Sequence, residues 1–362
     1  MQMFKIATYL SKSFILIWLT VVFGFLVLIA LLDSLANGGD ILADGGGFEN
    51  TFRYMMLRAP VIFDRIFMFT IVVAILLVYV KLIRQHELVA LLGFGISVAK
   101  QVLLLTPAVL GVALTSIAII NTAMPPAVRA LQTWGIGEYK TKTVSDEKPL
   151  WLASAGDIVR AGQRPSMDRL GNLEFFERDE NGEVISVTWA DEAIYSDGLW
   201  ELSGVQSLRI EGADGEPRLA LKQTGNSTWD TKQTPATIAR LAAEPRDLAL
   251  ADMQQFRAKG NSGSKPSFAY AFWFKHRLTR PIAALILLIC AVPLMQKTGR
   301  EASGDKALII GITMGFMFLI IDGAMSTFAA SGGIAVNWAI SIPLLCFALG
   351  GLYMCLRTES LR

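Results

Sequence analysis

The sequence predicts an α-helical membrane protein with six transmembrane helices and an all-β domain inserted between the third and the fourth. Two observations predict this class. Apolar residues make up 53% of the chain against 18% charged residues, and the mean hydropathy is +0.46, which is more apolar than soluble globular proteins are. The apolar stretches also fall into two groups of three, and a polar insert over residues 122–266 separates the groups.

Six stretches are apolar enough to form transmembrane helices. A helix rising about 1.5 Å per residue needs about 20 residues to cross a hydrocarbon core of about 30 Å. Uncharged runs cover residues 14–32, 102–120 and 338–356, and shorter apolar cores lie at 66–80, 281–295 and 307–321. We therefore expect residues 1–121 to hold helices one to three, 122–266 to form the inserted domain, and 267–362 to hold helices four to six.

Basic residues in the short connecting segments indicate the orientation. They gather on the side of both termini, at Lys5, Lys12, Lys81, Arg84, Lys100, Lys297, Arg300, Lys306, Arg357 and Arg362. The positive-inside rule then puts both termini in the cytoplasm and the insert outside. The three cysteines fall in helices four and six, so the insert has no disulfide and its own core must hold it together.

The insert has the pattern of a β-domain followed by two helices. Asn181-Gly182 between apolar runs is a strong hairpin signal. Further short strands are expected at 193–195, 199–202, 207–210 and 218–221, and their spacing favours a sandwich or jelly roll. Thr234-Pro235 opens a helix that reaches residue 243, and 248–258 is expected to form a second.

The cytoplasmic link between helices two and three is the segment most suited to coupling. Residues 87–92 favour a short helix that Gly93 and Gly95 end, and Ser97 is a plausible N-cap for the next helix. A short helix between glycines is the shape by which a membrane subunit fits a groove on a motor ATPase. The alternative is an ordinary interfacial helix.

Several motifs in this order resemble one family. Residues 86–97, His-Glu-Leu-Val-Ala-Leu-Leu-Gly-Phe-Gly-Ile-Ser, resemble the Ser-Glu-Leu…Arg-Ala-x-Gly-x-Ser coupling-helix signature of the LptF/LptG permeases. The hairpin at 181–182 followed by residues 193–202 resembles the external repeat of that family, with its Gly-x-Trp-x-Leu strand. Residues 234–248 resemble its Thr-Pro…Pro-x-x-Leu segment, and 272–281 resemble its basic, proline-containing start of the fourth span. Residues 31–33 and 254–256 favour the LptG branch over LptF.

The resemblance implies a function and a set of partners. The family supplies the membrane permease subunits of an ABC transporter, which extracts lipopolysaccharide from the bacterial inner membrane and passes it to a periplasmic bridge for export to the outer membrane. The implied partners are a paralogous permease, an LptB-type ATPase dimer that uses ATP and Mg, an LptC-type single-span subunit and lipopolysaccharide. No nucleic acid and no cofactor of the chain itself are expected.

The resemblance also implies a coupling site on the short cytoplasmic helix, expected at about 84–97. Its candidate residues are His86, Glu87, Leu88, Leu91, Gly93 and Gly95. The chain departs from the signature in two places, because His86 replaces the usual serine and Leu92 stands where the arginine is expected. One polar contact with the ATPase is therefore missing or supplied elsewhere.

Three further groups of candidates concern the lipid. A lateral gate is expected at Gly24, Leu28, Leu32, Gly311, Gly315 and Asp322, where small residues allow helices to pack closely and part. Lipid-headgroup cations are expected at Arg53, Arg58, Lys275, Arg277 and Arg280, which could instead simply anchor the helices. A lipid path is expected along the strands at Phe175, Val187, Trp189, Trp200, Leu202, Leu208 and Ile210, which in a closed sandwich would form the core.

Acidic residues at the outer ends of the helices leave two questions open. Asp322 is either a solvated interfacial acid or a gate residue that pairs with a basic group. Family members of the LptG type tend to carry basic residues beyond the first helix, where this chain has Asp33, Asp40 and Asp44. This departure puts a phosphate-binding role at those positions in doubt.

The sequence does not support catalysis by the chain itself. The two histidines, His86 and His276, are expected on opposite sides of the membrane, so they cannot share a metal. Residues 260–266 only mimic a Walker A motif, with the wrong spacing and a proline after the lysine. The alternative to a permease is a non-transporting membrane scaffold or mechanotransmitter coupled to an ATPase. A β-groove that is open and apolar would favour lipid passage, and a sealed core would favour the scaffold.

Overall fold

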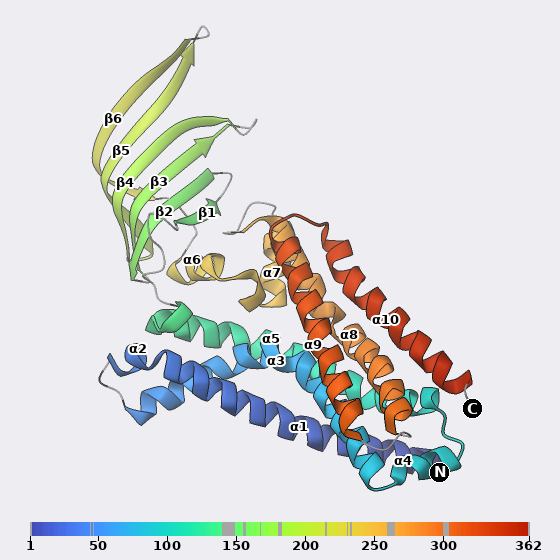
Figure 1. The fold of residues 1–362 in the computed structure, drawn as a ribbon. Helices are drawn as coiled ribbons and strands as arrows, with labels where there is room; N and C mark the ends of the chain where they lie inside the picture. The colour runs from blue at the N-terminus through green and yellow to red at the C-terminus, as the bar shows by residue number, and fades with distance from the viewer. Residues whose placement is uncertain are drawn as a thin grey trace. The chain divides into compact units, whose positions relative to one another are not determined.

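The computed structural model describes residues 2–43, 45, 47–139, 149–154, 157–166, 168–179, 183–213, 216–229, 231, 234–258, 265–299 and 304–360. The chain forms two compact units (Figure 1). The helical unit contains Met1–Ala36, Arg58–Ala123 and Ala271–Arg362, and the β unit contains Asn37–Leu57 and Met124–Tyr270. The β unit thus includes residues 37–57, which the sequence grouped with the first three transmembrane helices.

Six described helices are long and apolar enough to cross a membrane, as predicted. They are α1 Gln2–Ala36, α3 Phe48–Arg84, α5 Val98–Trp134, α8 Ser267–Gly299, α9 Gly304–Ala330 and α10 Val336–Ser360. At about 1.5 Å per residue, a helix such as α3, with 37 residues, is longer than the hydrocarbon core. The helices therefore extend beyond the apolar runs from which they were predicted.

The helical unit is built around α3 and α8. In the most apolar 18-residue stretch of α3, 72% is buried, and the value for α8 is 61%. The corresponding values are 17% for α1, 17% for α9 and 22% for α10. The core side chains of α3 include Phe67, Ile71, Ile75 and Leu76. The outer helices expose broad apolar faces, which is the expected arrangement for surfaces that meet lipid tails or other transmembrane helices.

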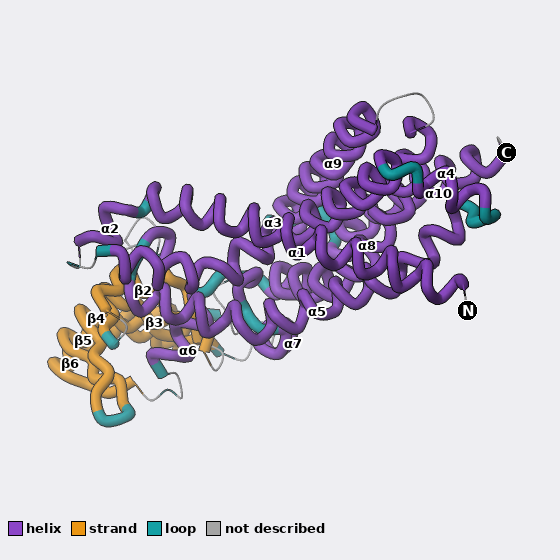
Figure 2. The backbone as a smooth tube through the Cα atoms, turned by 90° about the horizontal axis from the view of Figure 1, so that it is seen from below, coloured by secondary structure: helices purple, strands orange, loops and turns teal. Residues whose placement is uncertain are grey.

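The β unit contains one antiparallel sheet of six described strands in sequential order (Figures 1 and 2). The strands are β1 Leu150–Ser154, β2 Asp157–Ser166, β3 Arg169–Arg178, β4 Val184–Ser196, β5 Leu199–Ala213 and β6 Glu216–Trp229. The predicted β-domain is confirmed, but its strand order is a simple meander, without the crossovers of a jelly roll.

The strands are longer than the sequence predicted. β5 unites the two strands expected at 199–202 and 207–210, because the chain passes through Gly204 at a φ of +67° and pairing continues on both sides. The predicted hairpin between β3 and β4 is present as an antiparallel pair, whereas its turn at 180–182 lies outside the described residues. β4 and β5 join through Asp197 and Gly198, both at positive φ, as in the tight turns that suit hairpins.

The sheet folds over itself. In a flat sheet, the residue of β6 in line with Phe175 would be Lys222, which is reached from Phe175 by following the paired residues across β4 and β5. The Phe175 ring instead lies 5.2 Å from the ring of Trp229, at the end of β6 and seven residues farther along the strand. The bend follows the positive φ angles of Asn172 and Gly204 on β3 and β5. The sheet therefore curves around an apolar inner face, on which Phe175 and Trp229 are only half-buried.

Short helices complete the β unit. They are α2 Gly38–Ala43, the 3₁₀ turn Gly137–Tyr139, α6 Pro235–Ala242, the 3₁₀ turn Pro245–Asp247 and α7 Leu250–Ala258. The two helices predicted after residue 234, and the break at Pro245, are confirmed. α6 packs beside β1, and Ile41, Tyr54, Leu131 and Ile136 form a separate buried cluster.

Candidate functional site

The short helix α4, Glu87–Gly93, lies between α3 and α5 and has a defined C-terminal cap. The Ile96 N–H donates to the Leu91 carbonyl at 3.1 Å, and the Gly95 N–H donates to the Leu92 carbonyl at 3.0 Å. This pattern is a Schellman motif, in which a glycine takes the left-handed conformation, here at a φ of +74°. The prediction that glycine ends this helix is confirmed, and the helix is shorter than the expected 84–97.

Ser97 begins the next helix as predicted. Its Oγ accepts a hydrogen bond from the Lys100 N–H at 3.4 Å, which is the capping geometry of a serine at a helix N-terminus. The connection from α4 to α5 is therefore held at both ends by local hydrogen bonds. A short connection that is capped in this way leaves little conformational freedom between α4 and α5.

The exposed surface of α4 differs from the predicted coupling set. Leu88 is buried and Leu91 half-buried, whereas Val89 is 69% exposed and Phe94 79% exposed. His86, Gly93 and Gly95 are also exposed. The sequence assigned a docking role to Leu88, but its side chain is buried within the helical unit. Val89 and Phe94, which the sequence analysis missed, form the apolar surface that is open to a partner.

Glu87 is half-buried and contacts α1 within the helical unit. The Tyr9 hydroxyl of α1 donates a hydrogen bond to its carboxylate at 2.9 Å, and the Lys81 ammonium lies 5.6 Å from the centre of the Tyr9 ring. Glu87 therefore connects the start of α4 with α1, and this contact restrains the position of α4.

Two of the predicted headgroup cations are buried in ion pairs. Arg58 binds Asp33 through two hydrogen bonds, with Nε to Oδ2 at 2.7 Å and Nη2 to Oδ1 at 3.1 Å. Arg280 of α8 pairs with Asp64 of α3, and both side chains are almost fully enclosed. Asp33, which looked out of place beside the family pattern, thus serves as the counter-charge of Arg58. Contact of either arginine with a lipid headgroup stays a prediction.

The other three cations have different surroundings. The Lys275 ammonium donates to the Asn337 side chain of α10 at 2.7 Å. Arg277 is buried, with 3% of its surface exposed. In the β unit, the Arg53 guanidinium lies 4.6 Å from the centre of the Trp134 ring, which is a cation–π geometry.

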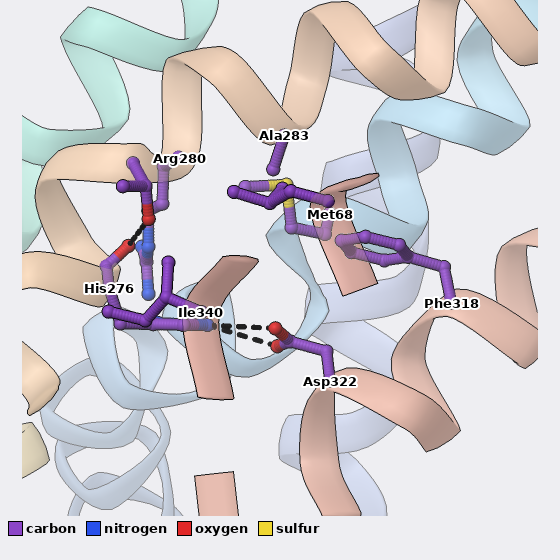
Figure 3. A pocket seen from close by; sticks show the side chains of 9 residues that line it. Met68, His276, Arg280, Ala283, Phe318, Asp322 and Ile340 are labelled. Carbon is purple, nitrogen blue, oxygen red and sulfur yellow. Dashed lines mark hydrogen bonds and ion pairs between the residues drawn. The ribbon is translucent and has the colours of Figure 1, made fainter. Parts of the chain in front are cut away.

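A small pocket lies next to the Arg280 pair (Figure 3). Side chains from α3, α8, α9 and α10 line it, namely Met68, His276, Thr279, Arg280, Ala283, Phe318, Asp322, Ile340 and Leu344. His276 Nε2 lies 3.0 Å from the Asp322 carboxylate, so Asp322 has the basic partner that one interpretation of it required. His276 Nδ1 and Arg280 Nη1 are buried without a hydrogen-bond partner among the described residues.

The predicted gate residues divide into two groups. Gly24, Leu28 and Leu32 lie on an exposed face of α1. By contrast, a Cβ added to Gly311 would come within 2.4 Å of Leu76, and one added to Gly315 would come within 3.0 Å of Val72, both on α3 of this chain.

The small-residue face of α9 therefore packs inside the helical unit. This differs from the predicted seam with a partner subunit. The physical reason is that glycines four positions apart allow any neighbouring helix to approach closely, and in this fold the neighbour is α3. The Phe69–Phe316 ring contact at 4.8 Å belongs to the same α3–α9 interface.

The strand residues proposed as a lipid path lie on both faces of the sheet. Phe175 and Trp200 contact Trp229 on the inner face, and Leu202 is buried at 6% exposure. Val187 pairs with Phe176 and Leu208, on the opposite face from Phe175, and Trp189, 38% exposed, shares that outer face. Ile210 lies in β5, but its side chain is outside the described residues.

The division between the faces has a local cause. Along a regular strand every second residue faces inward, but on β3, β4 and β5 this alternation shifts by one residue at the bend. On β5, for example, Leu202 and Val205 are both buried although they are three positions apart, on either side of Gly204. A prediction that assumes strict alternation along β5 therefore places Leu208 on the same face as Leu202, whereas the two lie on opposite faces of the sheet. The inner face consists of Leu150, Leu152, Val159, Ala161, Leu170, Leu173, Phe175, Ala190, Ala193, Trp200, Leu202, Val205 and Trp229.

Among the residues that the structure describes, no three His, Cys, Asp or Glu side chains gather closely enough to hold a metal ion. The described arrangement has three features that bear on function. It combines a capped, exposed apolar element on α4, membrane helices held by buried ion pairs, and an apolar sheet face.

Comparison with known proteins agrees with these features. The chain is 20% identical over 333 residues to the lipopolysaccharide export system permease protein LptG of Escherichia coli K12, with 91% of each protein covered. It is 20% identical over 252 residues to the LptG protein of Haemophilus influenzae, covering 64% of this chain and 68% of that protein. The model of the family "Lipopolysaccharide export system permease LptF/LptG" matches residues 8–357. The match runs through all six membrane helices and the whole described sheet, and the chain therefore belongs to the LptF/LptG family of lipopolysaccharide export permeases.

Proposed function

We propose that this chain is the LptG-type membrane subunit of a lipopolysaccharide exporter. It pairs with an LptF-type paralogue, an LptB-type ATPase dimer engages its α4, and an LptC-type single-span subunit completes the assembly. The family match over residues 8–357 carries the proposal, and the relatives named LptG favour that branch. Both termini lie in the cytoplasm and the β unit in the periplasm, as the distribution of basic residues indicates.

The energy for transport comes from the ATPase, and this chain converts it into helix movement. The exposed Val89 and Phe94 side chains form an apolar surface on α4 that suits a groove on the ATPase. The buried Leu88 and the Tyr9–Glu87 contact hold α4 against the membrane helices. Force applied to α4 is thus passed to α1, α3 and α5.

The β unit receives the lipid after it leaves the membrane. Each CH₂ group of an acyl chain that is exposed to water costs about 0.8 kcal/mol, so the acyl chains need an apolar surface outside the bilayer. The inner face of the folded sheet, with Phe175, Trp200 and Trp229, supplies aromatic and aliphatic side chains for that purpose. Lipid enters from the side of the helical unit, along the exposed face of α1 that carries Leu28 and Leu32.

A substitution on α4 tests the docking surface. We expect Phe94→Asp to weaken ATPase binding by about 2 kcal/mol or more, roughly thirtyfold, because truncation of a central aromatic anchor has effects of that size. The measurement is the amount of ATPase that co-purifies with the tagged permease pair. The matched control is Phe48→Asp, the same change at an exposed phenylalanine at the start of α3. Wild-type recovery of the ATPase with Phe94→Asp would contradict docking at α4.

Two neighbouring residues on opposite faces of the sheet test the lipid path. A photo-crosslinking amino acid at Phe175, on the inner face, is expected to capture lipopolysaccharide only while ATP is being hydrolysed. The same amino acid at Phe176, which stacks on Trp151 on the outer face, is the control. Equal capture at both positions, or capture that does not depend on ATP, would show that the inner face is not the path.

A further inference from the structure

A buried polar cluster connects the residues that follow α4 in the sequence with the membrane helices α3, α5 and α8. Tyr79 of α3 and Gln101 of α5 are fully buried, and Gln296 of α8 is 3% exposed. Polar side chains within apolar helices are costly unless they are paired, and they commonly mark functional positions. The cluster lies entirely within the helical unit.

Gln101 is the centre of the cluster. Its Nε2 donates to the Ile96 carbonyl at 3.2 Å. Its Oε1 accepts two hydrogen bonds, from Gln296 Nε2 at 2.8 Å and from the Tyr79 hydroxyl at 3.2 Å. Since Ile96 is the residue that closes the cap of α4, one side-chain amide joins the end of α4 to α8.

Gln296 lies in the last turns of α8, beyond a proline in the same helix. Gln296 follows Pro293, and a proline within a helix lacks the N–H that would bond to the preceding turn. The last turns of α8 are therefore less firmly tied to the rest of the helix. The same helix continues at its other end into the β unit, to which its first residues, up to Tyr270, belong.

We propose that Gln101 is a positioning residue that transmits displacement of α4 to the cytoplasmic end of α8. This inference rests on the proposed docking of the ATPase at α4. Apolar packing between helices resists both compression and separation, but it has no preferred direction. A hydrogen bond between Gln101 and Gln296 is directional and resists separation as well, so α8 follows α4 when the ATPase draws it back as well as when it pushes.

Gln296→Met tests the connection with little disturbance of the fold. Methionine has a similar length, and Gln101 Oε1 keeps the Tyr79 hydroxyl as a donor. The change also removes Gln296 Oε1, which is buried without a partner among the described residues. The assay uses the full complex in proteoliposomes and measures ATP hydrolysis and lipopolysaccharide release separately. We expect hydrolysis to persist while release per ATP falls about three- to thirtyfold, the range for single residues that carry coupling.

Three further variants separate transmission from packing. Tyr79→Phe removes the other donor to Gln101 and is expected to keep the wild-type ratio, because the connection from α4 to α8 stays intact. Ser116→Ala removes a buried hydroxyl of α5 that donates to Ala113 of the same helix, and it too should keep the ratio. Gln101→Leu should match Gln296→Met, and the double variant should lose no more than either.

The outcomes distinguish this inference from the proposed function. A wild-type ratio for Gln296→Met, or an equal loss for Tyr79→Phe, would show that the cluster only packs the helices. If Gln101→Leu does not assemble, Gln296→Met alone decides. An ATPase that stays bound and coupled in the Phe94→Asp variant would instead contradict docking at α4, whatever the Gln296 variant does.

Discussion

The ion pair between Asp64 and Arg280 allows a quantitative test of how the helical unit is held together. The Asp64 side chain is fully enclosed and that of Arg280 is 5% exposed, and the two belong to α3 and α8, the most buried membrane helices. Removing one partner of a buried pair costs about 3–5 kcal/mol, because the other charge stays buried without compensation. Replacing both partners with apolar residues of similar volume is often neutral or stabilising.

We therefore expect Asp64→Leu and Arg280→Met each to lower the free energy of unfolding by about 3–5 kcal/mol. The double variant should lose clearly less than the sum of the two single losses, because both charges of this pair are then removed together. It also removes Arg280 Nη1, which has no partner among the described residues. The matched control is Arg65→Met, at an exposed arginine next to Asp64, with an expected effect within about 0.5 kcal/mol.

The measurement is equilibrium unfolding of the purified chain in mixed micelles, with the four proteins of the cycle compared at the same detergent composition. The cycle yields the interaction energy of the pair directly. If the double variant loses the sum of the two single losses, the two residues act independently. That result would refute the role of the pair as the electrostatic connection between α3 and α8.

Three glycine substitutions, one of them a control, test the packing within each of the two units. Gly311→Leu should destabilise the helical unit by about 1–3 kcal/mol, because the new side chain would overlap Leu76. Gly24→Leu is the control and should have little effect, because a Cβ added at Gly24 has no atom within 4 Å. Equal melting temperatures for the two variants would contradict the α3–α9 interface. Gly204→Ala should destabilise the β unit by at least about 1–2 kcal/mol. The left-handed backbone at this position is strained for alanine, and the alanine Cβ would lie 2.0 Å from the Asp191 carboxylate. An unchanged midpoint of urea unfolding would show that the bend does not require glycine.

Local features of the sequence predicted the elements well. The apolar runs, the end of α4 at its glycines, the Ser97 cap and the helix that begins at Pro235 all depend on a few neighbouring residues. Hydrophobicity, the conformational freedom of glycine and the missing N–H of proline act within that range. The same reasoning failed for the faces of β5, because a single residue at positive φ, Gly204, reverses the alternation that it assumes.

The sequence by itself determined that this protein has six membrane helices, an inserted β-domain and a short helix capped at its glycines, because each follows from short-range chemistry. Only the tertiary structure decided which groups pair. Asp64 meets Arg280 across 216 positions and Gln101 meets Gln296 across 195. It also decided that Leu88 points inward while Phe94 is exposed, and that Gly311 packs against α3. Such contacts depend on how whole helices lie against one another, and periodicity along one helix does not specify its neighbour.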